Sequence, residues 1–110
     1  MAKINSNQKG KKGEREFANI CKKEGFTKAR RSQQYAGINN DADVVGLEGI
    51  HVEVKRVERL NIDKAMEQAI SDCKDEDIPI VAHRKNRQEW KVTMRLEDWF
   101  ELYKAWLKNN

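Results

Sequence analysis

The amino-acid sequence predicts one mixed α/β domain, in which helices flank a β-sheet and the elements follow the order α-β-β-β-α-β-β-α. Three observations predict this class. The chain has 110 residues, enough for one compact domain and too few for two. Segments with apolar residues at helical spacing alternate with short runs typical of strands. No repeat or linker divides the sequence, so we expect a flexible basic arm over residues 1–10 and one domain over 11–110.

The first predicted helix covers about residues 11–24. Gly25, followed by an apolar residue, is typical of a helix C-terminus. A short strand rich in arginine is expected within residues 27–33, and residues 34–40 contain the Gly and Asn of a loop. The apolar stripe of the helix consists of Phe17, Ala18, Ile20 and Cys21.

A hairpin follows, with strands over residues 43–45 and 50–55. If the turn is a three-residue loop with Gly49 in the left-handed conformation, Asp43 lies directly opposite Glu53. Alternation along the second strand then places the side chains of His51, Glu53 and Lys55 on one face and those of Ile50, Val52 and Val54 on the other.

The second half of the chain completes the sheet. Asn61 is expected to cap a helix over about residues 62–75, and strands are expected over 80–82 and about 90–94. A last helix over about 95–108 carries large apolar residues, which suit either core packing or an interface with a second copy. These are Leu96, Trp99, Phe100, Tyr103, Trp106 and Leu107.

Positive charge is concentrated at the start of the chain. Residues 1–31 hold ten Lys or Arg against three Glu, whereas residues 32–110 hold twelve against fifteen acidic residues. Such a segment suits contact with a polyanion, and a solubilising tail is the alternative. If the polyanion is DNA, the candidate phosphate contacts are Lys9, Lys11, Lys12, Arg15, Arg30 and Arg31.

The sequence also indicates where the protein acts. No segment reaches the roughly 18 apolar residues of a membrane span, so no membrane partner is expected. The basic, polar N-terminus lacks the apolar run of a secretory signal. Cys21 and Cys73 lie on apolar helix faces and are expected to be buried free thiols. Together these features favour a cytoplasmic protein.

Asp43, Glu53 and Lys55 form the predicted reactive cluster. Directly opposed residues have Cβ atoms only about 5 Å apart, and two carboxylates at that separation repel each other unless a proton or cation lies between them. Mg²⁺ prefers oxygen ligands and retains water, so it suits this pair. Lys55, on the same face as Glu53, could orient a water molecule or stabilise charge on a phosphate. The alternative is a solvated strand face with an ordinary Glu–Lys pair.

Three further residues are candidates for this site. Glu14 borders the apolar stripe of the first helix, where a carboxylate requires a cation, either a metal ion or a basic side chain. Asp41 has the same strand parity as Asp43 and is its rival. His51 could approach the metal or a phosphate, with an exposed strand histidine as the alternative.

These motifs together resemble a known family. Gly10-x-x-x-Glu14-Arg15-Glu16, then Asp43-Val-Val, then Glu53-Val-Lys55 is similar to the PD-(D/E)xK nuclease superfamily, and within it to the archaeal-type Holliday junction resolvases and their phage-encoded relatives. The resemblance implies a restriction-endonuclease-like fold, with Glu14, Asp43 and Glu53 as metal ligands and Lys55 as the catalytic lysine. It also implies Mg²⁺, with Mn²⁺ as a substitute. Gln68, on the helix after the motif strand, is similar to a polar residue often found there in the family; because it lies off the apolar stripe, an ordinary exposed Gln is the alternative. Ala42 stands where the family motif often has Pro.

The resemblance favours a homodimeric, metal-dependent endonuclease that resolves four-way DNA junctions, and its phage-encoded relatives suggest a phage protein that acts in the host cytoplasm. Two alternatives stay open. One is a nicking or restriction-like endonuclease that cuts linear duplex DNA. The other is a DNA-binding module without catalysis, in which the acidic cluster is only structural.

Overall fold

The computed structural model describes the backbone of residues 6–32 and 42–110, with their side chains from Gly10 onward. In these residues, three helices surround a five-stranded sheet with the strand order β1-β2-β3-β4-β5. The fold class and element order are those predicted. The helices are α1 (Ser6–Lys23), α2 (Ile62–Asp72) and α3 (Leu96–Lys108), and the strands are β1 (Arg30–Arg31), β2 (Val44–Val45), β3 (Ile50–Lys55), β4 (Ile78–His83) and β5 (Lys91–Met94).

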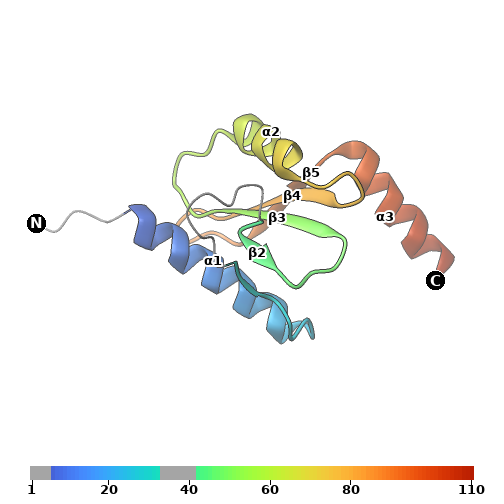
Figure 1. Ribbon diagram of the computed structural model, residues 1–110, viewed down its shortest axis with the longest axis horizontal. Coiled ribbons are helices and arrows are strands. Elements are labelled where there is room, and N and C mark those ends of the chain that lie inside the picture. Colours follow the sequence, from blue (N-terminus) through green and yellow to red (C-terminus); the bar gives the residue numbers. More distant parts are fainter. Residues whose placement is uncertain (1–5, 33–41) are drawn as a thin grey trace, which may run out of the picture.

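Helices α1 and α2 lie on opposite sides of the sheet, and α3 lies at one end of it (Figure 1). The face of β3 that carries Val52 and Val54 packs against Phe17 of α1 in the main apolar core. The opposite face of the sheet packs against α2, where Val81 of β4 contacts two alanines. Val81 is the parallel partner of Glu53, so Glu53 lies on the α2 side of the sheet.

Helix α1 begins at Ser6, five residues before the expected start, so residues 6–10 belong to the helix and not to the expected arm. Gly13 permits close contact between α1 and the segment that leaves β3, because an added Cβ there would lie 2.6 Å from the Cβ of Arg56. The helix ends as predicted. Gly25 has φ 105°, and the amide of Phe26 donates to the carbonyl of Cys21 at 3.0 Å.

The β2–β3 hairpin has the predicted loop and register. Gly49 has φ 83°, the left-handed conformation expected of it. Val44 pairs with Val52, in the alignment that the three-residue loop requires. Asp43 immediately precedes β2, and its amide donates to the carbonyl of Val52 at 2.8 Å, so the aspartate is held against β3 by its backbone.

The second half of the chain also follows the prediction, with shifted ends. The Asn61 side chain caps α2 by accepting from the amide of Lys64 at 3.1 Å, and α2 ends at Asp72, before the expected 75. Strand β4 is longer than expected and includes the buried Pro79. Cys21 is buried as expected, whereas Cys73 at the end of α2 is only partly buried; both are free thiols. None of the helices described here is long and apolar enough to cross a membrane.

Candidate active site

The site is built around two acidic residues from adjacent strands. Glu53, in the middle of β3, is 3 % exposed. The Oδ2 atom of Asp43 accepts a hydrogen bond of 2.8 Å from the amide of Val54, the residue after Glu53. The aspartate side chain is thereby fixed against β3 near Glu53, while its own amide bonds to the carbonyl of Val52 and not to that of Glu53.

The two carboxylates strongly affect each other. Burial, and then repulsion from Glu53, raise the pKa of Asp43 from its usual 3.8 to about 7. The hydrogen bond from Val54 opposes this rise and does not cancel it. Two carboxylates this close and this little hydrated are stabilised when a proton or a cation lies between them.

Glu14 of α1 lies in the same cavity but has a protein partner. Its Oε1 atom accepts from Nε of Arg31 at 2.8 Å. Burial raises the pKa of Glu14 despite this ion pair, and repulsion from Glu53 adds to the rise. Glu14 therefore belongs to the acidic cluster, while its charge is balanced by the arginine of β1.

Lys55 and Gln68 complete the lining of this cavity. Its volume is about 280 Å³, and it is lined by Gly10, Glu14, Asp43, Glu53, Val54, Lys55, Arg56, Val57 and Gln68. Lys55, the last residue of β3, is partly buried, whereas Gln68 of α2 is exposed. The carboxylates, the lysine and the glutamine predicted from the sequence thus meet at one end of the sheet, between α1 and α2.

His51 is buried, which corrects the expectation of an exposed strand histidine. It is 5 % exposed, and its Nε2 atom lies 2.9 Å from Oε1 of Glu53. Residues two apart on a strand share one face, so the sequence indicated that the two side chains could be neighbours. It did not indicate that both of them would be buried.

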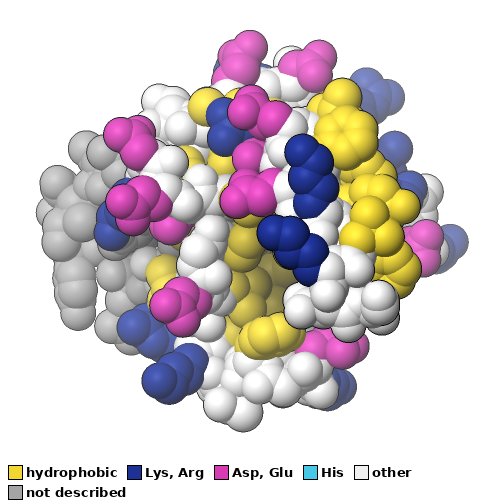
Figure 2. Space-filling view, turned by 90° about the vertical axis from the view of Figure 1, so that its right-hand side faces the viewer, with side chains coloured by type: hydrophobic (Ala, Val, Ile, Leu, Met, Phe, Trp, Pro, Cys, Tyr) yellow, Lys and Arg dark blue, Asp and Glu magenta, His cyan; other side chains and the backbone are white. Residues whose placement is uncertain are grey.

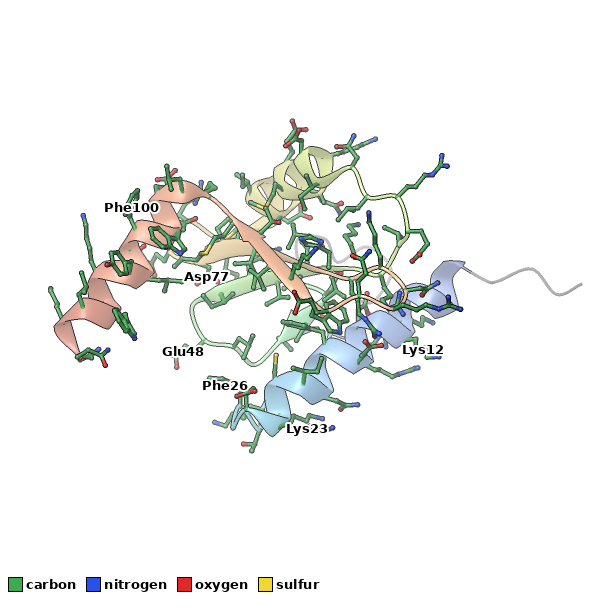
Figure 3. All side chains as sticks on the ribbon, turned by 180° about the vertical axis from the view of Figure 1, so that it is seen from behind. Lys12, Lys23, Phe26, Glu48, Asp77 and Phe100 are labelled. Atoms are coloured by element: carbon green, nitrogen blue, oxygen red, sulfur yellow. The ribbon has the colours of Figure 1, made fainter. Side chains whose placement is uncertain are left out.

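The candidate phosphate contacts fall into two groups. Lys11, Lys12, Arg15 and Arg30 are exposed, and Figure 3 shows Lys12 near the N-terminal end of α1. Arg31 is partly buried and forms an ion pair with Glu14, so its positive charge is already balanced within the protein. The side chain of Lys9, the rival Asp41 and the loop 34–40 lie outside the described residues.

The residues present fit a divalent cation held by two carboxylates. Among the described residues, no three His, Cys, Asp or Glu side chains are gathered in a group that could hold a metal ion by themselves. Mg²⁺, however, is commonly bound through one or two carboxylates and keeps several waters. Asp43 and Glu53 provide such a pair, and burial together with repulsion from Glu53 raises the pKa of Asp43, as expected of two close carboxylates without a cation between them.

A mixed sheet that carries an acidic pair, with a lysine two residues after the second acid, is typical of nuclease domains of the PD-(D/E)xK class. Residues 5–110 match the family described as "Phage putative PDDEXK endonuclease". The chain belongs to this family, which agrees with the resemblance in its motifs. No curated protein and no solved structure matches the chain.

The acidic pair gives a prediction for stability. The pKa of Asp43 is raised from its usual 3.8 to about 7 in the folded protein. Between about pH 4 and pH 7 the folded protein therefore still holds a proton that the unfolded chain has already released. The free energy of unfolding should therefore rise as pH falls from 8 towards 5. Asp43→Asn should keep the acceptor for Val54 and stabilise the metal-free protein at pH 8, by on the order of 3 kcal/mol.

Urea denaturation of both proteins at pH 8 and pH 5, in a chelator, measures this effect. Asp75→Asn, in an exposed loop, is the matched control and should change the free energy of unfolding by less than about 0.5 kcal/mol. Equal stability of Asp43→Asn and the unmodified protein at pH 8 would show that the acidic pair is not strained.

Proposed function

We propose that this protein is a divalent-metal-dependent DNA endonuclease, with Mg²⁺ as its cofactor and Mn²⁺ as a substitute. The observation that supports it best is the pair of largely buried carboxylates, Asp43 and Glu53, in one cavity with Lys55. A bound divalent cation supplies Lewis-acid stabilisation of phosphate charge and a water of lowered pKa.

Each side chain then has a distinct role. Asp43 and Glu53 hold the cation, and Glu14 adds negative charge that Arg31 moderates. His51, at 2.9 Å from Oε1 of Glu53, holds that carboxylate in place. The ammonium group of Lys55 can donate to an oxygen of the scissile phosphate or to the attacking water, which lowers the energy of the charged transition state.

The exposed face of α3 supports a homodimer. Of the residues described, none from α3 joins either apolar core, and the exposed fractions of its large apolar residues range from 42 % for Tyr103 to 69 % for Leu96. Trp99, Tyr103 and Trp106 stack along the helix, with centroid distances of 5.2 Å and 6.1 Å. Patches of this kind mark interaction sites on soluble proteins.

The same end of the molecule has a recess that could receive such a helix. A cavity of about 500 Å³ is lined by Phe26, Leu47 and Ile50 among others. Figure 2 shows apolar side chains along one side of this end and a hollow with apolar walls beside them. A projecting apolar helix and an apolar hollow on one face suit a twofold interface, in which each copy provides both.

This interface would leave the catalytic cavity open, because it lies at the opposite end. Figure 3 shows Phe26 and Phe100 at one end of the molecule and Lys12 at the other. A twofold dimer carries two active sites, which can cut two strands symmetrically, as the resolution of a four-way junction requires. We therefore propose a Holliday junction resolvase, encoded by a phage and acting in the host cytoplasm.

Cleavage of a labelled four-way junction, beside linear duplexes that contain the same arm sequences, tests this substrate. We expect paired nicks in strands of like polarity on the junction and at least about tenfold slower cutting of the duplexes, a difference of about 1.4 kcal/mol in activation free energy. Equal rates on both substrates would instead favour the nicking or restriction-like alternative. Tight binding without any cutting would favour the non-catalytic module.

A further inference from the structure

The turn between β4 and β5, residues 84–90, lies beside the catalytic cavity. Strand β4 runs parallel to β3, with His83 in register with Lys55. The chain leaves β4 at Arg84, whose amide donates to the carbonyl of Lys55 at 3.1 Å. Figures 1 and 3 both show this turn at the end of the sheet where α1 begins and β3 ends. The turn is therefore next to any DNA strand that enters the cavity.

Hydrogen bonds fix this turn to the segment that follows the catalytic lysine. Arg56 donates from Nη1 to Oδ1 of Asn86 at 2.9 Å, and the amide of Asn86 donates to Oε2 of Glu58 at 2.8 Å. Arg84 donates from Nε to the carbonyl of Gln88 at 2.6 Å. These bonds hold the turn in a defined position relative to Lys55.

The turn presents two cationic side chains to solvent. The charge of Arg84 is balanced by Glu16 of α1, with which it forms an ion pair. Lys85 and Arg87 are exposed, and neither forms an ion pair with any acidic residue in the described part of the chain. Glu89, also exposed, is the acidic residue of the turn itself. Both positively charged side chains are therefore available to bind an anion from solution.

Arg87 occupies a conformation that favours glycine. Its φ is 63°, and it is the one residue other than glycine with positive φ in the described part of the chain. It stands third in a turn closed by the hydrogen bond from the amide of Gln88 to the carbonyl of Lys85, at 3.2 Å. An arginine that occupies a strained position next to a reactive site points to a role for its side chain.

We propose that Lys85 and Arg87 bind the phosphate backbone of the DNA beside the cut, as a contact surface separate from the cationic residues of α1. This inference rests on the proposed nuclease function, because it takes DNA as the ligand. The two side chains neutralise phosphates and position the strand over Lys55, and they read no base sequence.

The test is a pair of charge-matched double variants, with fluorescence anisotropy of a labelled four-way junction and a linear duplex in Ca²⁺ buffer. The double variant Lys85→Gln with Arg87→Gly should bind both DNAs about tenfold more weakly. The slope of the logarithm of its binding constant against the logarithm of the salt concentration should be shallower by about 1.8, the value for two phosphate contacts. Its melting temperature should be unchanged or higher, because glycine relieves the strain at position 87.

The control, Lys22→Gln with Lys23→Gln, removes the same charge from the far end of α1, where Figure 3 shows Lys23. It should leave affinity within about twofold and the salt slope unchanged. The single variant Arg87→Lys, which keeps both positive charges, should bind DNA nearly as tightly as the unmodified protein. Equal weakening in both double variants, or in neither, overturns the inference. Cleavage by the unmodified protein in Mg²⁺ tests the nuclease function separately, since the anisotropy comparison requires no turnover.

Discussion

Glu53→Gln and Lys55→Ala should each reduce DNA cleavage by about a thousandfold or more, because each removes a group that stabilises the transition state. The two variants should differ in metal binding. Glu53→Gln loses one of two buried carboxylates and should bind Mn²⁺ much more weakly, whereas Lys55→Ala should keep the metal site. DNA affinity should be maintained in both, and Glu53→Gln should bind slightly better because it removes negative charge near phosphate.

Isothermal titration with Mn²⁺ and anisotropy with labelled DNA separate these effects. Glu67→Gln is the matched control, since this exposed glutamate of α2 lies outside the cavity, and it should cut DNA at the normal rate. Unchanged Mn²⁺ affinity in Glu53→Gln would contradict its assignment as a metal ligand. Normal cutting by Lys55→Ala would remove its catalytic role.

Tyr103→Gln combined with Trp106→Gln should convert the protein from a dimer to a monomer. Both side chains lie on the exposed apolar face of α3, at 42 % and 58 % exposed. Large aromatic residues at the centre of an interface each contribute about 2 kcal/mol or more, so the dimer dissociation constant should rise by at least about a hundredfold. Four-way junctions should then receive single nicks in place of paired ones.

Sedimentation velocity at micromolar concentration measures the first effect. Glu101→Gln combined with Lys108→Gln changes exposed charged residues of the same helix without changing net charge, and it should sediment as the unmodified dimer. A monomeric unmodified protein in this concentration range would contradict the dimer proposal, and α3 would then need a different partner.

Most of the fold was predictable because local signals agree with tertiary packing. The Gly49 turn fixes the β2–β3 register, and that register places Asp43 beside the strand that carries Glu53. The Asn61 cap similarly marks the start of α2. In such cases a few neighbouring residues determine the structure, so sequence patterns are sufficient.

The start of α1 was not predictable from local signals. Residues 1–10 are mostly Asn, Ser, Gln, Lys and Gly with few apolar residues, a composition that favoured a flexible arm. In the structure Gly13 is required inside the helix, because α1 contacts Arg56 there. The partner of Gly13 in this contact lies 43 positions away in the sequence, so the close packing becomes visible only with the fold.

The partners within the site depend on long-range contacts in the same way. The sequence offered Glu14 either a metal ion or a basic side chain, and the structure provides Arg31 from β1. It also left open whether the apolar face of α3 packs in the core, and the structure exposes it. His51 could be assigned to the face of Glu53, but its burial results from how the rest of the chain covers that face.

DNA cleavage should require a divalent cation held by Asp43 and Glu53, and this requirement can be measured. Its most direct test is single-turnover cleavage of a labelled four-way junction by the unmodified protein and by Glu53→Gln, each in Mg²⁺ and in excess EDTA. We predict cutting only by the unmodified protein in Mg²⁺, with no cleaved DNA formed in the other three reactions. Cutting by the unmodified protein in EDTA, or by Glu53→Gln in Mg²⁺ at a normal rate, would contradict the claim.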